Sequence, residues 1–422
     1  MVQAVLPCRE ISAILIELAN LNPPKCEFNS NSVKQALQLL GKPQDSYPVI
    51  HIAGTNGKGS TAAFIESGLL AAGYRVGKYT SPYILEINEC IRLNQHNISD
   101  RELAEIYSEL KPQLLAHQIL LSSFEMLTVI MLVYFARSEI DYLVLETGLG
   151  GLNDATNVVN SQFSLITNIS LEHTQWLGNT LSEIAAHKAG IINGGRCLIA
   201  DDTPELMAAV AKRTSNWMNV LDKYHYRSQL NYRDFTTRVW FKRTDDAVVN
   251  SVELGLFGHF QARNFLLAYE VLQEIGVAPE VIFDSARITR WPGRLQRLSN
   301  FPLIIADAAH NAGGCANLVQ SVQEMVDRSN CVVLASILAD KDVTTMLDYY
   351  ATLGDSLVTC NLPQQPRALP AMALAKLAQG KFKNVYIHNS PLTALQFAKR
   401  LDKKMIIVSG STYLLKYFVT AI

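Results

Sequence analysis

Short apolar runs rich in β-branched residues alternate with longer segments of helical periodicity along most of the chain. A short apolar run predicts a strand, and apolar positions at i, i+3, i+4 and i+7 predict a helix. Strands that alternate with helices are typical of an α/β fold with a doubly wound, mostly parallel sheet. In the N-terminal part the predicted strands are Val49–Ile52, Tyr142–Glu146, Ser164–Ile169 and Cys197–Ala200, and the predicted helices are Thr61–Ala72, Asp100–Leu115, Met126–Ala136 and Leu181–Ile192.

Two local signals refine this pattern. Thr180 and Glu183 have the spacing of a capping box, which predicts that a helix begins just after Thr180. Residues 238–242 and 247–249 lie on either side of a polar turn at 244–246, so we expect a β-hairpin added to the α/β domain.

A stretch with proline, glycine and four arginines, Arg287–Arg297, interrupts the alternation. We interpret it as a linker, because a chain of 422 residues exceeds the size at which one core usually stops growing. The predicted organisation is therefore a domain at 1–289, a linker at 290–296 and a smaller α/β domain at 297–422. In this second domain the predicted strands are Leu303–Ala306, Cys331–Ser336, Leu357–Cys360, Val385–Ile387 and Met405–Val408, with helices near Leu318–Met325, Thr344–Tyr350, Ala371–Leu377 and Pro391–Leu401.

Composition narrows the class of protein. About half of the residues (49%) are apolar and 18% are charged, which is typical of a globular enzyme. The formal net charge of −1 gives no electrostatic reason to expect a nucleic acid or an acidic membrane as partner. Seven cysteines without a C-x-x-C pair argue against a disulfide framework or a thiolate zinc site. We expect a cytoplasmic protein, since no secretory pattern or membrane-spanning run is present.

Residues 48–61, PVIHIAGTNGKGST, carry the strongest functional signal. A strand that leads into a glycine-rich turn and then a helix is typical of a phosphate site. Backbone N–H groups converge on the anion there, and the helix N-terminus adds the positive end of its dipole. Lys58 would contact β- and γ-phosphates, and Ser60 offers a hydroxyl to Mg²⁺. The candidate nucleotide-binding residues of the loop are Gly54, Thr55, Asn56, Gly57, Lys58, Gly59 and Ser60.

The loop is a shortened variant of the Walker A motif. Ile52 stands where the motif has its first glycine, and Gly59 stands where serine or threonine follows the lysine. A flexible glycine turn with a solvated lysine is the plainer interpretation, but the flanking strand and helix favour nucleotide binding. The loop alone does not separate a GTPase, a kinase and a ligase.

A set of further segments, in their order along the chain, resembles the folylpolyglutamate synthase/dihydrofolate synthase family of the Mur ligase superfamily. They cover nearly the whole chain. These segments are HIAGTNGKGST (51–61), TSP (80–82), SFE (123–125), ETGLGGLNDATN (146–157), TNISLEHTQWLG (167–178), HKAGII (187–192), RN (263–264), WPGR (291–294), DAAHN (307–311), DKD (340–342) and SGSTY (409–413).

The resemblance implies a fold and a reaction. The fold is an N-terminal P-loop domain with a doubly wound, mostly parallel sheet and an added hairpin, followed by a smaller Rossmann-like α/β domain. The reaction is an ATP-dependent amide ligation that adds L-glutamate to dihydropteroate or folates through an acyl phosphate. The implied partners are these small molecules and ATP, with no nucleic acid or membrane, and relatives act as monomers.

The resemblance also implies metal ligands and a modified lysine. Ser60, Ser81, Glu146 and His173 would hold two Mg²⁺ ions, and a monovalent cation is a further expectation. Lys188 would be carbamylated to N6-carboxylysine, so that Glu146, His173 and Lys188 form the catalytic set. The plainer interpretations are a helix-capping carboxylate for Glu146, a turn histidine for His173 and a solvated surface lysine for Lys188.

Two groups of binding residues follow from the same resemblance. Asn264, Arg294, Asp307 and His310 would contact ATP, although a helix-interior asparagine, a linker arginine and a capping aspartate are the plainer interpretations. The residues implied for the pterin or folate are Ser123, Phe124, Glu125, Asn153, Asp154 and Ala155, of which Phe124 is also a plausible core residue.

The chain departs from the family pattern near the pterin site. Tyr83 replaces a histidine, Cys90 replaces an arginine, and Asn29–Ser32 stands where a G-L-x-R element is usual. These changes leave the identity of the acyl acceptor open. The alternatives are an enzyme with only one of the two glutamylation activities, another Mur-type ligase, and a non-catalytic nucleotide-binding regulator. A GTPase is disfavoured because no N-K-x-D segment follows a strand.

Overall fold

The computed structural model describes residues 8–22 and 29–419, in two compact units. The first unit comprises residues up to Lys223 together with Leu266–Ile282, and the second comprises Tyr224–Phe265 and the chain from Phe283. The second unit therefore contains the segment around the predicted hairpin as well as the C-terminal α/β sheet.

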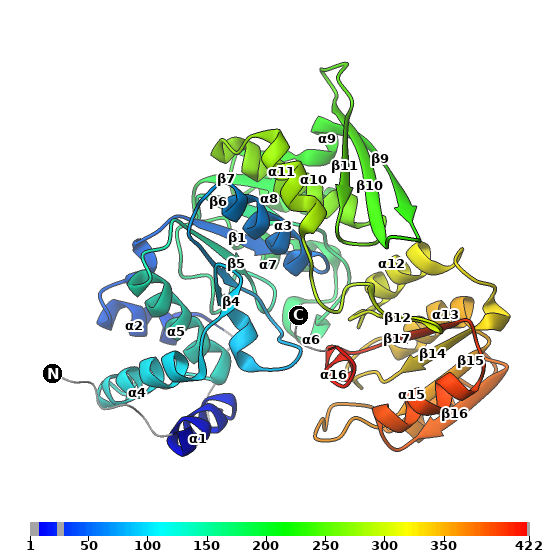
Figure 1. The fold of residues 1–422 in the computed structure, drawn as a ribbon. Coiled ribbons are helices and arrows are strands. Elements are labelled where there is room, and N and C mark those ends of the chain that lie inside the picture. The colour runs from blue at the N-terminus through cyan, green and yellow to red at the C-terminus, as the bar shows by residue number, and fades with distance from the viewer. Residues whose placement is uncertain (1–7, 23–28, 420–422) are drawn as a thin grey trace. The chain divides into compact units, whose positions relative to one another are not determined.

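The first unit is built on an eight-stranded sheet with the order β4-β3-β2-β5-β1-β6-β7-β8. Strands β2, β5, β1, β6, β7 and β8 are parallel, and β3 and β4 are antiparallel at one edge. Strand β1 lies at the centre between β5 and β6 (Figure 1). The strands are β1 (Val49–Ala53), β2 (Val76–Tyr79), β3 (Ile91–Leu93), β4 (His96–Asn97), β5 (Tyr142–Glu146), β6 (Phe163–Ile166), β7 (Arg196–Ile199) and β8 (Trp217–Asn219).

Helices cover this sheet and bury its apolar side chains. Helix α5 is almost entirely buried because its sequence is apolar on all sides. Helices α1, α2, α4 and α5 gather on one side of the sheet and share one core with β1, β2 and β5 (Figure 1). The helices are α1 (Cys8–Ala19), α2 (Asn31–Leu39), α3 (Lys58–Ala71), α4 (Asp100–Ala116), α5 (Ser123–Arg137), α6 (Thr174–Leu177), α7 (Leu181–Ala189), α8 (Pro204–Ala211) and α9 (Val220–Lys223), with short 3-10 turns at Pro43–Asp45 and Ile87–Cys90.

Several predicted boundaries in this unit were wrong, among them the start of α5, which is at Ser123 rather than Met126. Helix α3 begins at Lys58 rather than Thr61, so the lysine belongs to the first helical turn. Strand β6 ends at Ile166 rather than Ile169, because the following polar residues bond to the loop after β1. Helix α7 ends at Ala189 rather than Ile192, although the predicted capping box of Thr180 and Glu183 is present.

The second unit contains a three-stranded antiparallel sheet with the order β11-β10-β9. Its strands are β9 (Tyr224–Asn231), β10 (Thr236–Arg243) and β11 (Asn250–Leu254). The predicted hairpin is present as β10 and β11, but its second strand was placed too early at 247–249. Helices α10 (Gln261–Ile275) and α11 (Pro279–Ile288) follow this sheet in the chain and are divided between the units, since Leu266–Ile282 belongs to the first unit.

A six-stranded sheet with the order β12-β13-β17-β14-β15-β16 forms the rest of the second unit. Strand β12 (Gln296–Asn300) is antiparallel to β13 and was missed, since its mostly polar sequence resembles a linker. The other strands are β13 (Leu303–Ala306), β14 (Cys331–Ala335), β15 (Ser356–Cys360), β16 (Asn384–His388) and β17 (Met405–Ser409), and the helices are α12 (Ala312–Val322), α13 (Val343–Leu353), α14 (Ala371–Leu377), α15 (Pro391–Arg400) and α16 (Thr412–Leu415), with a 3-10 turn at Arg328–Asn330.

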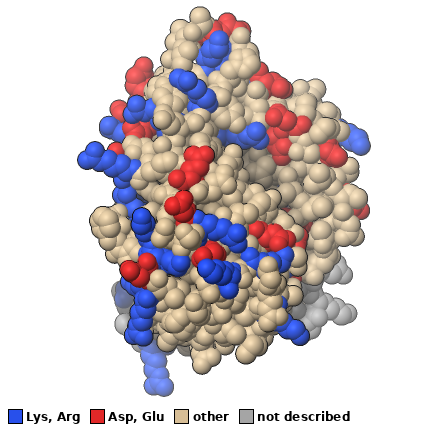
Figure 2. All heavy atoms as spheres, turned by 90° about the vertical axis from the view of Figure 1, so that its right-hand side faces the viewer, with Lys and Arg blue, Asp and Glu red and all other residues tan. Residues whose placement is uncertain are grey.

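Acidic and basic side chains are interspersed on the face shown in Figure 2, as expected from the near-zero net charge. None of the helices within 8–22 and 29–419 is long and apolar enough to cross a bilayer. Cysteine Cys26 lies outside the described residues. Among the described residues, the free cysteines are Cys90, Cys197, Cys315, Cys331 and Cys360, and all five are buried.

Candidate functional site

The glycine-rich loop joins β1 to α3 in a conformation that its glycines make possible. Gly54 has φ +147° and Gly57 has φ +91°, both in the region that side chains disfavour. A Cβ atom at position 54 would also clash with the hydroxyl of Thr167, which follows β6. Glycine at this position is therefore required by both the backbone and the space.

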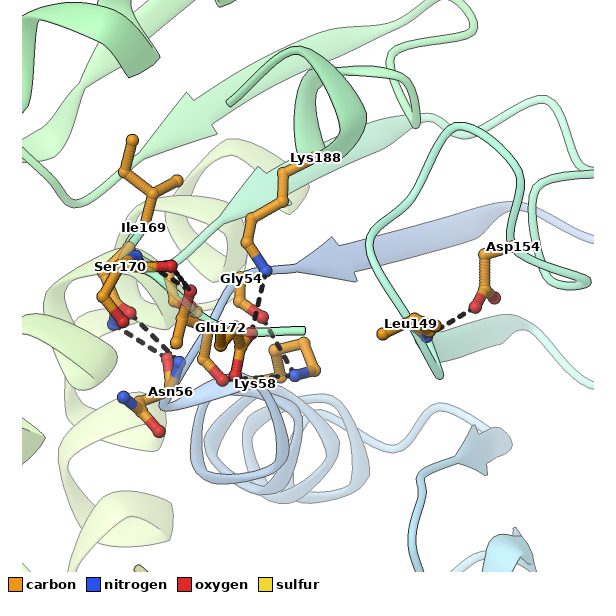
Figure 3. Close-up of polar contacts among 12 residues, drawn as sticks. Gly54, Asn56, Lys58, Leu149, Asp154, Ile169, Ser170, Glu172 and Lys188 are labelled. Atoms are coloured by element: carbon orange, nitrogen blue, oxygen red, sulfur yellow. Dashed lines mark hydrogen bonds and ion pairs between the residues drawn. The ribbon is translucent and has the colours of Figure 1, made fainter. Parts of the chain in front are cut away.

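The segment 167–170 braces this loop from the side of β6 (Figure 3). Asn168 bonds Asn56 in both directions, since its Nδ2 donates to the Asn56 carbonyl at 2.8 Å and its Oδ1 accepts from the Asn56 amide at 3.0 Å. The Thr167 hydroxyl donates to the same carbonyl at 2.6 Å, and the Ser170 amide donates to the Thr55 hydroxyl at 3.0 Å. These bonds hold the loop in its conformation by contacts within the protein alone.

Lys58, the first residue of α3 after the loop, lies close to a carboxylate. Its Nζ donates to the carbonyl of Gly54 at 2.9 Å (Figure 3). The same nitrogen lies 3.9 Å from Oε1 of Glu146, at the end of β5. Glu146 is 5% exposed, so this pairing of opposite charges is only weakly screened. The predicted phosphate loop and the predicted acidic residue at the end of β5 thus lie next to each other.

Lys188 is buried in the last turn of α7, rather than in mid-helix as the sequence predicted. Its side chain is 1% exposed, and Nζ lies 3.3 Å from Oε1 of Glu172, whose side chain is also buried. Burial lowers the pKa of Lys188 to about 8, with the Glu172 carboxylate opposing and the Lys58 charge adding to this shift. The plainer interpretation of Lys188 as a solvated lysine is therefore wrong.

The candidate metal ligands all belong to the first unit. Ser60 is buried in the first turn of α3, Ser81 follows β2, and His173, with φ +48°, directly precedes α6. The described residues contain no cluster of three or more His, Cys, Asp and Glu with the geometry of a metal site. A serine hydroxyl and the Glu146 carboxylate still suit Mg²⁺, which is commonly held by one or two protein oxygens together with phosphates and water.

Phe124 lies against the glycine segment that follows β5. A Cβ atom at Gly148 would clash with the Phe124 ring, and this ring lies 6.0 Å from the ring of Tyr79. Glu125 caps its own helix, since its carboxylate accepts from the amide of Ser122 at 2.8 Å. Ser123 and Phe124 are half-buried, while Glu125 is buried.

Asp154 is enclosed by its own loop. Its Oδ2 accepts from the Leu149 amide at 2.6 Å (Figure 3), and its Oδ1 accepts from the amide and the hydroxyl of Thr156 at 3.0 and 2.6 Å. Burial raises the pKa of this carboxyl, and hydrogen bonds from Thr156 and from the Leu149 and Gly148 amides oppose that shift. Asn153 is half-buried beside it and Ala155 is buried.

The remaining candidate residues lie in the second unit. Asp307 is buried after β13 and accepts from the amides of Leu295 and Ala309, both at 2.8 Å. Burial raises the pKa of this carboxyl and the positive charge of Arg294 lowers it. The contacts of the other candidates are from His310 Nδ1 to the Ala308 carbonyl at 2.9 Å and from Asn264 Nδ2 to Gln261 at 2.9 Å.

Sequence reasoning missed the residues that support the loop and the buried lysine. Thr167, Asn168 and Ser170 brace the phosphate loop, and Glu172 accompanies Lys188. A signal was present, because these polar residues come directly after an apolar strand at the ligand-binding edge of a parallel sheet. The strand was predicted to extend through Ile169, and that error hid Thr167 and Asn168.

Comparison with known proteins agrees with this geometry. The Mur ligase middle domain matches residues 52–272, and the Mur ligase glutamate ligase domain matches residues 293–412. A dihydrofolate synthase/folylpolyglutamate synthase from Bacillus subtilis is 32% identical over 397 residues, which are 90% of this chain and 92% of that protein.

Two solved structures share the fold over nearly the full length. The structure of Mycobacterium tuberculosis folylpolyglutamate synthase with ADP and AMPPCP has a TM-score of 0.87 and 29% identity, covering 96% of this chain and 97% of that one. The bifunctional enzyme from Yersinia pestis, complexed with AMPPNP and a Mn ion, has a TM-score of 0.83 and 26% identity, covering 96% of both chains. With the matches above, these likenesses show that the chain belongs to the folylpolyglutamate synthase/dihydrofolate synthase family of the Mur ligase superfamily.

Proposed function

We propose that this protein is an ATP-dependent, ADP-forming ligase that adds L-glutamate to dihydropteroate and to folates. The observation that carries the proposal is the phosphate loop, held open by Gly54 and Gly57 and braced by Asn168, with Lys58 beside Glu146. The membership in a family of such ligases supports the same reaction.

In this reaction the phosphate loop binds ATP and a carboxylate of the pterin substrate attacks its γ-phosphorus. The new O–P bond forms as the bond to the ADP oxygen breaks, which gives an acyl phosphate. The amine of glutamate then attacks the acyl carbon, inorganic phosphate leaves, and the amine loses a proton. Lys58 and the backbone N–H groups of the loop stabilise the charge on the phosphates.

We place the divalent ions on oxygen ligands of the first unit. Ser60, Ser81 and Glu146 would hold one Mg²⁺ with the phosphates, and His173 would contribute to a second. Bound Mg²⁺ supplies charge neutralisation on the transferred phosphoryl group. The Yersinia pestis structure with a Mn ion supports a divalent metal, and the second ion and a monovalent cation are part of the proposal.

Lys188 has the environment that carbamylation requires. The amine nitrogen must be neutral to attack the carbon of CO₂, forming an N–C bond and losing a proton to solvent. Burial favours that neutral form, because it lowers the pKa of Lys188 to about 8. The resulting N6-carboxylysine would give His173 and the second ion a carboxylate neighbour.

We propose roles for the other candidates in the same reaction. Asn264, Arg294, Asp307 and His310 of the second unit contact ATP. Asp307 then has a double role, because its oxygens already accept two backbone N–H bonds within its own unit. The pterin would contact Ser123, Phe124 and Glu125 at the start of α5 and Asn153, Asp154 and Ala155 in the segment after β5, and the contact of Phe124 with Gly148 of that segment supports this grouping.

The proposal also includes the domain boundaries, the oligomeric state and the cellular location. We propose domains at 1–289 and 297–422 with a linker at 290–296. The two Mur ligase matches at 52–272 and 293–412 support a division in this region. A monomer in the cytoplasm is proposed as well, in keeping with the free thiols among the described residues.

A phosphate-release assay tests this function. The purified protein is given ATP, Mg²⁺ and L-glutamate, with dihydropteroate, tetrahydrofolate or a muramyl peptide in parallel. We expect phosphate release with dihydropteroate and with tetrahydrofolate. Activity with only one of these two would reduce the assignment to a single synthase. Activity with the muramyl peptide alone, or ATP binding with no turnover on any acceptor, would overturn it.

A further inference from the structure

Three buried polar side chains, one of them in the strand that leads into the phosphate loop, form a continuous row of hydrogen bonds. His51 lies in β1, and Thr156 and Asp154 lie in the segment that follows β5; their exposures are 0%, 0% and 1%. His51 Nε2 lies 2.9 Å from the Thr156 hydroxyl, which donates to Asp154 Oδ1 at 2.6 Å. These hydrogen bonds link β1, the strand that leads into the phosphate loop, to the segment 148–157.

The direction of these hydrogen bonds follows from counting hydrogens. Asp154 accepts from the Leu149 amide and from the amide and hydroxyl of Thr156, so it is the acceptor end of this row of hydrogen bonds. The Thr156 hydroxyl has one hydrogen, which it gives to Asp154, and His51 Nε2 must therefore donate to Thr156. Burial lowers the pKa of His51 to about 3, so the ring stays neutral and Nδ1 carries no hydrogen. Nδ1 has no hydrogen-bond partner among the described residues, and this leaves an acceptor rather than an N–H unsatisfied.

The same segment is attached to the end of α7 on its other side. The Leu152 amide donates to the His187 carbonyl at 2.7 Å, directly before Lys188. Asn157 Nδ2 donates to the Leu152 carbonyl at 2.9 Å and to the Gly190 carbonyl at 3.1 Å. A Cβ atom at Gly151 would lie 2.6 Å from the His187 carbonyl oxygen, so the backbones are in close contact.

We infer that His51 and Thr156 are positioning residues that fix the segment 148–157 between β1 and the lysine-bearing end of α7. Hydrogen bonds from Thr156 and from the Leu149 amide to Asp154 join the two ends of the segment. The segment closed in this way keeps the Leu152 amide on the His187 carbonyl of α7. Thr156 thereby sets the place of Asn153 and Asp154, which the proposed function assigns to the pterin substrate. The kinetic part of this inference rests on that proposed function, whereas the structural part does not.

Two substitutions at one position separate the hydroxyl from the volume. Thr156→Val keeps the shape and removes both hydrogen bonds of the side chain, and Thr156→Ser keeps the hydroxyl. Thr359→Val is the matched control, because Thr359 is equally buried in the second unit and donates to the Ala371 carbonyl at 3.0 Å. If Thr156→Val does not fold, His51→Gln, which keeps an N–H donor, is compared with His51→Leu, which does not.

Hydrogen exchange of the peptide containing 148–157 gives the readout that is independent of activity. In Thr156→Val we expect the Leu149 and Leu152 amides to exchange about tenfold faster, since one lost hydrogen bond changes an opening equilibrium by about that factor. Thr156→Ser and Thr359→Val should leave these amides protected. Unchanged exchange in Thr156→Val, or the same increase in Thr359→Val, would overturn the inference.

Steady-state kinetics then test the consequence for the substrate. We expect Thr156→Val to raise the KM for the pterin substrate about tenfold while the KM for ATP stays within about twofold, and Thr156→Ser to behave as the unmodified protein. An equal fall in activity with both KM values unchanged would contradict a positioning role. If the unmodified protein turns over no acceptor, the proposed function fails while the exchange result still decides the structural inference.

Discussion

At the scale of single residues, two lysines of the first unit are held in contrasting ways. Lys58 donates to a loop carbonyl and lies 3.9 Å from the Glu146 carboxylate, so its charge is supported. Lys188 is more deeply buried, and desolvation is the largest influence on its pKa of about 8. Lys58 is held by these two contacts at the phosphate loop, whereas the environment of Lys188 suits an amine that reacts.

Lys58→Ala should reduce kcat/KM for ATP by about a hundredfold or more, because a preorganised cation at the phosphates is lost. Lys34→Ala is the control, since Lys34 is exposed on α2. The comparison is made by phosphate release at several ATP concentrations. Normal turnover in Lys58→Ala would remove the main support for the proposed function.

Lys188→Ala should lose most activity and regain part of it when a short carboxylic acid is added, because the acid replaces the carboxylate of N6-carboxylysine. In the unmodified protein, labelling with ¹³CO₂ at constant dissolved CO₂ should increase as pH rises through about 8, since the neutral amine becomes the main form there. Carbon-13 NMR of a carbamate signal measures this. A carbamate signal that persists in Lys188→Ala would assign the modification to another lysine.

At the scale of elements, the ends of three neighbouring parallel strands supply the candidate site. Strand β1 leads into the phosphate loop, β5 ends at Glu146, and β6 leads into the bracing segment 167–170. Their carboxyl ends meet at one edge because the strands are parallel and adjacent. The loop is therefore held by backbone and amide bonds between elements that are distant in sequence.

Asn168→Asp should weaken ATP binding by about tenfold or more, because the variant loses the Nδ2 donor to Asn56 and places a negative charge beside the phosphate loop. Asn216→Asp, at an exposed position before β8, is the matched control. Isothermal titration with ATP and Mg²⁺ measures the difference. Equal affinities for the two variants would show that the segment 167–170 does not support the loop.

Because His51 is buried and neutral, we expect the first unit to become less stable at acidic pH. The folded pKa of His51, about 3, lies below the ordinary value of about 6.5, so between these values the unfolded chain binds a proton that the folded chain does not. Stability from this residue therefore falls as pH falls from about 6.5 towards 3. His51→Gln does not titrate, and urea unfolding at pH 7.5 and 4.5 should show a smaller loss for it. Parallel losses would contradict a neutral buried His51.

The central strands of the eight-stranded and six-stranded sheets could be predicted from sequence, and several boundary details could not. Strands such as Tyr142–Glu146 are short apolar runs, and burial on both faces makes that pattern unambiguous. Strand β12 is polar and lies at a sheet edge, so only its pairing with β13 reveals it. The Lys188–Glu172 contact joins two segments outside the sheet, and no local pattern encodes that pairing.

At the scale of the whole molecule, each compact unit has a hydrophobic core of its own. The core shared by α4, α5 and β1 belongs to the first unit, and the core around β13, β14 and α13 belongs to the second. A ligand that binds the folded first unit raises the free energy of unfolding of that unit by mass action.

ADP with Mg²⁺ should raise the unfolding temperature of the first unit, because a ligand at a hundredfold excess over its Kd adds about 2.7 kcal/mol to the folded state. Differential scanning calorimetry, with Lys58→Ala as the comparison, measures this. We expect the shift to disappear in Lys58→Ala and in the presence of a metal chelator. An equal shift in Lys58→Ala would mean that ADP binds elsewhere.

The contact between Gly148 and Phe124 has a consequence for how sequences of this kind diverge. A methyl group at position 148 fits only if the aromatic ring at position 124 becomes smaller or moves, so neither position drifts independently. In an alignment of relatives these two columns should covary, with bulk at one accompanied by a smaller residue at the other. Size exchange across this pair would then be a natural route by which such enzymes change the acid that they accept.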